Sequence, residues 1–167
     1  MARLGATRNT PFVSSGFTLV ELVITVAIVA ILATAAVPLG ELAVTRSREQ
    51  DLRRNLREIR EALDAHKQAW DEGRIARQPG DSGYPKSLDV LVMGVDDIKD
   101  PKKAKIYFLR RVPGDPFASD PGVSTAASWG KRSYASPPDD PREGDDVFDV
   151  FSLAAGKGLN GRPYREW

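Results

Sequence analysis

A charge-free apolar run near the N-terminus constrains this chain more than any other feature. Leu22 to Leu39 form a run of 18 residues without a charged side chain. As a helix rising 1.5 Å per residue, the run would span roughly 27 Å, close to the hydrocarbon thickness of a bilayer. Residues 1–16 carry Arg3 and Arg8 and no acid. By the positive-inside rule, the N-terminus is then cytoplasmic and the rest of the chain lies beyond the membrane.

Three interpretations of this segment compete: a secretory signal removed after the apolar run, a plain signal anchor, and a processed anchor. The string Gly16-Phe17-Thr18-Leu19-Val20-Glu21, followed by the apolar run, resembles the type IV prepilin signature. The resemblance implies that a membrane-embedded prepilin peptidase cuts after Gly16, removes residues 1–16 and methylates the new amino group of Phe17.

Glu21 is an acid placed one turn into a helix that enters lipid. An unpaired charge there costs on the order of 2.5–3.5 kcal/mol or more, so such a residue usually has a partner. The resemblance implies that Glu21 of an incoming subunit pairs with the Phe17 amine of a neighbour during assembly. Thr18-x-x-Glu21 also matches a capping box, in which Glu21 helps to begin the helix. The two roles are compatible.

Pro38 and Gly40 lie near the outer end of the apolar run. Proline removes a helix hydrogen bond and often kinks the helix. The resemblance implies that the helix loosens at this pair in the assembled filament, whereas a simple kink at the membrane exit is the other interpretation.

The helical pattern continues from Glu41 to about Glu72. Apolar residues at three- and four-residue steps or their sum predict a stripe that packs on a head domain: Leu52, Leu56, Ile59, Leu63 and Trp70. The other face carries potential i, i+4 ion pairs, namely Glu49–Arg53, Arg54–Glu58, Arg57–Glu61 and Arg60–Asp64. Gly73 is the expected C-cap. His66, the single histidine, is expected at the surface or its boundary rather than as a ligand.

The remaining residues predict a small α+β head. We expect a short helix over 87–93 with Ser87 as its N-cap, a turn or strand over 106–109, and strands over 129–135 and 146–152. A charged loop over 96–103, a proline-rich acidic loop over 137–146 and an irregular tail from Ala154 complete it. The predicted organisation is therefore a leader (1–16), a transmembrane or filament-core helix (17–40), its amphipathic continuation (41–72) and a globular head (73–167).

Short strings in the head extend the resemblance. Their order is similar to the major pseudopilin of type II secretion: Tyr84-Pro85, Leu109-Arg-Arg-Val-Pro-Gly-Asp-Pro-Phe117, Trp129-Gly130, the run from Val147 to Leu153, and Trp167. The chain has no cysteine, unlike many type IV pilins that close a C-terminal loop with a disulfide. The resemblance implies a pilin-like fold, a long N-terminal helix packed on a small antiparallel-sheet head.

Major pseudopilins bind calcium in the loop after their last strand, and this chain departs from that pattern. Calcium takes six to eight oxygen ligands, several of them carboxylates. The corresponding loop, 153–160, contains Lys157 and no acid. We therefore expect no cofactor from this loop. The acids Asp139, Asp140, Asp145 and Asp146 are the remaining calcium candidates, and their pattern is equally typical of a solvated loop.

Composition excludes several other functions. Without cysteine there is no disulfide and no Cys nucleophile, and one histidine excludes sites that need two. A net charge of +1 provides no basic field for nucleic acid. No phosphate-binding glycine loop with its Lys and Ser/Thr is present, so we expect no enzyme.

The resemblance implies a structural subunit of the bacterial inner membrane that polymerises into the periplasmic pseudopilus of a type II secretion system. Its implied partners are further copies of itself, minor pseudopilins, the prepilin peptidase, and an inner-membrane assembly platform driven by a cytoplasmic ATPase. The alternatives are a type IV pilus subunit for adhesion, motility or DNA uptake, and a membrane-anchored binding protein that does not polymerise.

Overall fold

The computed structural model describes residues 16–118, 122 and 124–167. Its elements are one long helix, one short helix, four short strands and two 3-10 turns: α1 (Leu19–Asp71), α2 (Leu88–Met93), β1 (Val95–Asp96), β2 (Lys105–Ile106), η1 (Thr125–Ser128), β3 (Trp129–Arg132), β4 (Asp149–Ser152) and η2 (Tyr164–Glu166). This is the expected mixed α+β architecture, consistent with a pilin-like fold. The predicted leader, apart from Gly16, lies outside the described residues.

Both ends of α1 have sequence-encoded caps. At the start, the Thr18 hydroxyl accepts the amide N–H of Glu21 at 3.2 Å, which satisfies one of the free donors of the first turn. At the end, Gly73 has a φ of +69°. Its N–H donates to the carbonyl of Trp70 and the next N–H donates to the carbonyl of Ala69, each at 2.9 Å. This is a Schellman motif, and it confirms the C-cap predicted at Gly73.

The chain divides into two compact units, residues 1–42 and 43–167. α1 runs through Pro38 and Gly40 as continuous helix. The side chains of residues 35–38 lie outside what the structure describes, so the kink expected at Pro38 and Gly40 stays a prediction. The second unit contains the C-terminal half of α1 and the head, and it holds the hydrophobic core.

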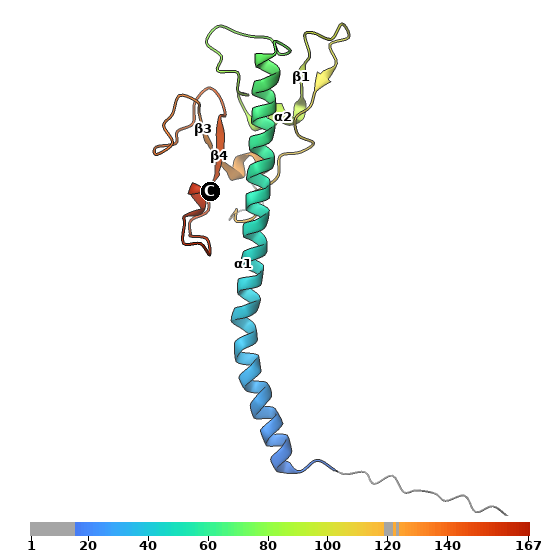
Figure 1. Cartoon of the computed structure of the whole chain (residues 1–167), viewed down its shortest axis with the longest axis vertical. Coiled ribbons are helices and arrows are strands. Elements are labelled where there is room, and N and C mark those ends of the chain that lie inside the picture. The colour runs from blue at the N-terminus through green and yellow to red at the C-terminus, as the bar shows by residue number, and fades with distance from the viewer. Residues whose placement is uncertain (1–15, 119–121, 123) are drawn as a thin grey trace, which may run out of the picture. The chain divides into compact units, whose positions relative to one another are not determined.

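Two separate hairpins build the sheet structure of the head. β1 pairs with β2, and β3 pairs with β4, both antiparallel. In the second hairpin Trp129 lies opposite Ser152 and Arg132 opposite Asp149. Figure 1 shows the two hairpins on either side of the C-terminal half of α1.

Several predicted elements differ from those observed. The strands predicted over 129–135 and 146–152 are shorter, because the chain turns at Ser133, whose carbonyl accepts the Ser136 N–H. The charged loop predicted over 96–103 connects an unpredicted hairpin, β1–β2. Ser87 occupies the N-cap position of α2, but its side chain makes no capping hydrogen bond. The tail predicted as irregular contains η2.

The core forms where the apolar stripe of α1 meets the head. Leu52, Ile59 and Leu63 are fully buried. They pack in one cluster with side chains from α2, both strands of the second hairpin and the tail: Leu88, Leu91, Trp129, Val150 and Tyr164. The predicted stripe is therefore confirmed for its leucines and isoleucine, whereas Trp70 is only half-buried.

None of the four predicted i, i+4 ion pairs forms among the described residues of α1. Glu49 is buried and binds the tail, Arg54 pairs instead with Asp51 at 2.8 Å, and Arg60 pairs with Asp149 at 2.8 Å. Arg57 and Glu61 stand in the weaker order, with the cation N-terminal to the acid. Within the part of the chain that the structure describes, Arg57, Glu58, Glu61 and Asp64 consequently have no ion-pair partner.

Candidate functional site

The first half of α1 presents its apolar side chains outward. Every residue from Phe17 to Thr34 is exposed, and Phe17 itself is 81% exposed. Among the described helices, α1 alone is long and apolar enough to cross a membrane, with a mean hydropathy of 2.7 over its apolar window and none of that window buried. These side chains therefore need lipid or other chains to cover them.

The hydroxyl groups of this segment are already satisfied within the helix. Thr25 donates to the carbonyl of Leu22 at 2.9 Å, and Thr34 donates to the carbonyl of Ile31 at 2.7 Å. A hydroxyl that returns a bond to its own helix can enter lipid without an unpaired donor. Glu21 is the contrasting case.

Glu21 lies in the first turn of α1 with an unpartnered side chain. Its amide is capped by Thr18, as the capping-box interpretation predicts. The reciprocal bond from the Thr18 amide to the Glu21 carboxylate does not form, and that carboxylate has no hydrogen bond or ion pair within the part of the chain that the structure describes. The local cap therefore uses the Glu21 backbone and leaves the charge of its side chain available to another group.

At Gly16 and Gly40 the described part of the chain leaves room for a larger side chain. A Cβ added at either position would meet nothing within 4 Å. Gly158 differs sharply, because a Cβ there would lie 2.2 Å from the Trp167 ring. If glycine is required at position 16, the reason lies in another molecule, and recognition by a peptidase would be such a reason.

The loop after β4 is held to α1 by a buried carboxylate. Glu49 is 6% exposed. It accepts the Leu159 amide at 2.6 Å and the Tyr164 hydroxyl at 3.4 Å. The Tyr164 ring stacks on Phe117 at 4.3 Å, and Arg53 lies over the Trp167 ring at 4.4 Å. Sequence reasoning missed Glu49, because no spacing rule relates positions 110 residues apart.

A calcium site of the family's kind does not fit this loop. The loop has no acid of its own, and the carboxylate that reaches it binds an N–H and an O–H donor rather than facing a set of free oxygens. The Glu49 and aromatic contacts join the tail to α1 by hydrogen bonds and packing.

The four acids proposed as other calcium ligands lie along the exposed loop between β3 and β4. Asp140 pairs with Arg142, and Asp146 accepts the Tyr134 amide at 2.9 Å. Asp139 and Asp145 are exposed. Among the described residues, no group of three or more His, Asp or Glu side chains gathers in a way that could hold a metal.

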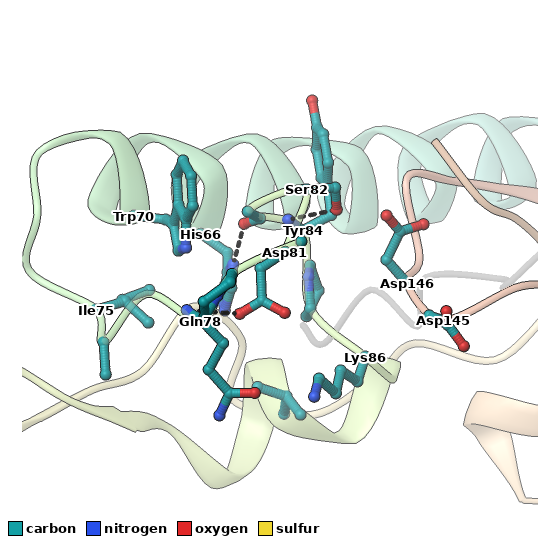
Figure 2. Close-up of a pocket in the computed structure, with 16 residues that line it drawn as sticks. His66, Trp70, Ile75, Gln78, Asp81, Ser82, Tyr84, Lys86, Asp145 and Asp146 are labelled. Carbon is teal, nitrogen blue, oxygen red and sulfur yellow. Dashed lines mark hydrogen bonds between the residues drawn. The ribbon is translucent and has the colours of Figure 1, made fainter. Parts of the chain in front are cut away.

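A hollow of 630 Å³ lies beside the C-terminal end of α1. Figure 2 shows His66 and Trp70 reaching it from the helix, with Asp81 on the loop and Asp145 and Asp146 on the other side. His66 is 5% exposed, so it is buried rather than at the surface or its boundary as expected. Its Nδ1 hydrogen bonds to the carbonyl of Gly83 at 3.0 Å, and burial lowers its pKa below the usual 6.5. Position 66 falls on the buried side of α1 one turn after Ala62, which was the missed signal.

Arg60 ties the last strand and the tail to α1. Its guanidinium donates to the Asp149 carboxylate at 2.8 Å and to the carbonyls of Val150 and Trp167 at 3.1 and 2.9 Å. Arg132 reaches the same carboxylate from β3 at 3.3 Å. Arg60 therefore positions the head on the helix and is not part of the exposed charged face.

The fold and the N-terminal segment together define a small α+β head carried on a single long helix with an exposed apolar half. Residues 13–37 match the prokaryotic N-terminal methylation motif. This match supports a type IV prepilin-like protein and indicates a structural, pilin-like subunit of the inner membrane that prepilin peptidase processes for assembly into a pilus-like polymer. Comparisons with curated proteins and with solved structures find no match.

Proposed function

We propose that this chain is a pseudopilin that polymerises into the periplasmic pseudopilus of a type II secretion system and helps to drive protein export. The observation that carries the proposal is the unpartnered Glu21 carboxylate at the start of an apolar, fully exposed helix. A charge kept in lipid without a partner is costly, so its retention is explained by a partner on another chain.

The cut after Gly16 would supply that partner. It frees the amine of Phe17, a cation located about 6 Å along the helix before Glu21. A neighbouring copy displaced outward by about this distance brings its amine level with Glu21. Pairing would then remove two uncompensated charges from lipid, while helix–helix contacts cover the exposed apolar residues 17–34.

The contacts within the head support the secretion assignment. The strings that resemble a major pseudopilin are far apart in sequence but touch in the second unit. The Val147 amide donates to the carbonyl of Pro85 at 2.8 Å, and the Trp129 ring donates to the carbonyl of Pro113 at 2.7 Å. Asp115 accepts the hydroxyl of Ser152. Each of these short sequence similarities is weak alone, but their contacts in one packed unit support the resemblance to a pseudopilin.

The proposal carries a topology and a set of partners. The N-terminus is cytoplasmic, one helix spans the inner membrane and the head is periplasmic. An ATPase-driven platform extracts each copy, minor pseudopilins are further partners, and the growing filament pushes cargo outward. In this proposal the chain has a structural role, and the chemistry at Gly16 and Phe17 is done to it by the peptidase.

Substitution of Glu21 tests the assembly role. Glu21→Ala and Glu21→Gln should both abolish filaments and secretion while the protein remains in the membrane with unchanged head stability. Glu41→Gln, which removes an acid at the other end of the apolar run, is the matched control. Undiminished filaments or secretion with either Glu21 variant would show that the chain is only an anchor.

Two further measurements test processing and the type of polymer. The intact mass of the membrane-extracted protein should correspond to a chain beginning at Phe17 and carrying one added methyl group. A species beginning earlier in cells with active peptidase contradicts maturation. Deletion of the gene should block cargo release and leave surface pili and motility intact, whereas the reverse pattern would identify a type IV pilus subunit.

A further inference from the structure

A second hollow, of about 330 Å³, lies between the middle of α1 and the C-terminal tail. Figure 1 shows the end of the tail, in red, beside this part of the helix. Four arginines line the hollow: Arg53, Arg57 and Arg60 from α1 and Arg162 from the tail. Glu166 is the one acidic residue among the described residues of this lining. The hollow is therefore predominantly basic.

The local sequence places these arginines together. Arg57 follows Arg53 by one helical turn and Arg60 follows Arg57 by three residues, so all three share one face of α1. On the tail, the side-chain oxygen of Asn160 accepts the Arg162 N–H at 3.0 Å. This turn holds the backbone of Arg162 beside the hollow that its side chain lines.

Most of this positive charge is not neutralised within the described chain. Arg60 pairs with a carboxylate of β4 at 2.8 Å. Arg53 lies over the Trp167 ring and has no ion pair there. The guanidinium groups of Arg57 and Arg162 make no hydrogen bond or ion pair with a described residue. Like charges one turn apart on a helix repel each other, and the tail adds a third.

Glu166 does not supply the missing counter-charge. Its carboxylate is exposed and makes no ion pair with a described residue. Its backbone is held in η2, where its N–H donates to the carbonyl of Pro163 at 3.0 Å. A single carboxylate also cannot pair with three guanidinium groups at once, because it offers only two oxygens.

A buried donor at the same hollow lacks an acceptor as well. The indole N–H of Trp167 is buried and has no hydrogen-bond partner in the described part of the chain. Burying a donor without an acceptor is unfavourable, and such a group calls for an explanation. The free arginines and this indole therefore share one deficit, which is the lack of a negatively charged acceptor.

We infer that this hollow binds a small multivalent oxyanion, a phosphate or a polycarboxylate, which bridges Arg53 and Arg57 of α1 to Arg162 of the tail. Guanidinium groups present paired N–H donors that match two oxygens of a carboxylate or phosphate. The volume lies at the small end of the range for ligand sites, about 300–1,000 Å³. The bound anion would remove the repulsion among the arginines and fasten the tail to α1. All residues of the site belong to one chain, so the inference goes beyond the proposed function and does not depend on it.

Titration of the purified full chain, in detergent and free of lipid, tests the site. Inorganic phosphate and citrate are the two probes, each followed by calorimetry and by thermal unfolding. At least one of them should bind saturably with one site per chain and raise the unfolding midpoint. Sodium chloride at equal ionic strength should not raise it. Binding without saturation, or equal stabilisation by sodium chloride, would mean charge screening only and would overturn the inference.

Substitutions locate the bound anion. Arg57→Gln and Arg162→Gln should each weaken binding about tenfold or more, since each removes charge-assisted hydrogen bonds. Arg165→Gln, on the same tail but outside the lining, is the matched control and should leave the affinity unchanged. Glu166→Gln removes the competing acid and should tighten binding severalfold. An equal loss in Arg165→Gln would indicate general attraction by a basic surface and would contradict a defined site. Unfolding of each variant without anion should match that of the original chain, so that weaker binding does not reflect a damaged fold.

Two further measurements test the bridge and the source of the anion. Saturating phosphate or citrate should slow hydrogen exchange at the Gly158 and Trp167 amides about tenfold in the original chain and leave it unchanged in Arg162→Gln. Unaltered exchange in the original chain would show that the anion does not join the tail to α1. Phosphatidic acid vesicles are the lipid probe. Binding to these vesicles without any binding of the free anions would make the ligand a lipid headgroup, and the inference of a free oxyanion would fail.

Discussion

The two halves of α1 belong to one continuous helix but meet opposite surroundings. From Phe17 to Thr34 every side chain is exposed, although most are apolar. From Leu52 to Leu63 the apolar side chains are buried under the head. The first half has no partner within its own described chain, whereas the second half has a complete one. The first half is thus built for contacts with other molecules, and the second half for holding the head.

Because the two halves of α1 have different contacts, substitutions in them should affect different properties: the stability of the head or the assembly of chains. A substitution in the first half should alter contacts between chains and leave the unfolding of the head unchanged. A substitution in the buried stripe should do the reverse.

Truncating one apolar side chain in each half should show the largest contrast. Leu63→Ala removes a fully buried side chain and should lower the free energy of unfolding of the head by about 2–5 kcal/mol. Ile28→Ala, at a half-exposed position in the first half, should leave it unchanged. Denaturant unfolding of the detergent-solubilised full chain measures both. A loss at Ile28 comparable to that at Leu63 would mean that the first half packs within the chain.

Removing the buried carboxylate should have the next largest effect. Glu49→Ala leaves the Leu159 amide without its acceptor and should cost about 1–3 kcal/mol of stability. Hydrogen exchange at the Leu159 amide should accelerate more than exchange elsewhere in the head. Glu58→Ala, on the exposed face of the same helix, is the control and should change neither measurement. Unchanged exchange at Leu159 would show that the tail is held by its aromatic contacts alone.

Sequence reasoning predicted best what local chemistry decides. The apolar run, the Thr18 cap, the Gly73 C-cap and the stripe at Leu52 and Leu63 depend on near neighbours along one helix, and all appear as expected. The helix was expected from Phe17 to about Glu72 and runs from Leu19 to Asp71.

Residues whose role depends on distant partners could not be predicted in this way. Glu49 looked like one half of an exposed pair with Arg53, but the tail buries it and Arg53 turns to Trp167. Arg60 was predicted to pair with Asp64, but in the folded chain it pairs with Asp149 of β4. Spacing along a helix shows which charges can meet, and tertiary contacts decide which of them do.

The glycines at positions 40 and 73 should respond in opposite directions to the same substitution. Gly73→Ala forces a side chain into a positive-φ conformation and should cost about 1–2 kcal/mol. Gly40→Ala adds a methyl group in open space on a helix and should favour the helix locally by about 0.5–1 kcal/mol. Hydrogen exchange around position 40 should then slow by roughly two- to fivefold. If loosening at Pro38 and Gly40 is needed for assembly, Gly40→Ala should also reduce filament yield. An unaltered yield would show that Gly40 itself is not needed for assembly.

Titration of His66 should produce the smallest effect, which is nearly absent at neutral pH. Burial lowers the pKa of His66 below 6.5 in the folded chain, while the unfolded chain keeps the usual value. Between these two values the unfolded state binds more protons, so the free energy of unfolding falls as the pH drops below about 6.5. Asp81, Asp145, Asp146 and Lys86 line the same hollow, and Phe108 packs on the ring. His66→Asn keeps a donor for the Gly83 carbonyl but does not titrate, so its unfolding should lose this slope over the same range. If the pH dependence of unfolding persists in the His66→Asn variant, the neighbouring carboxylates are responsible for it instead. The first half of α1 has no histidine, so its helicity should not change over this pH range in the original chain or in the variant.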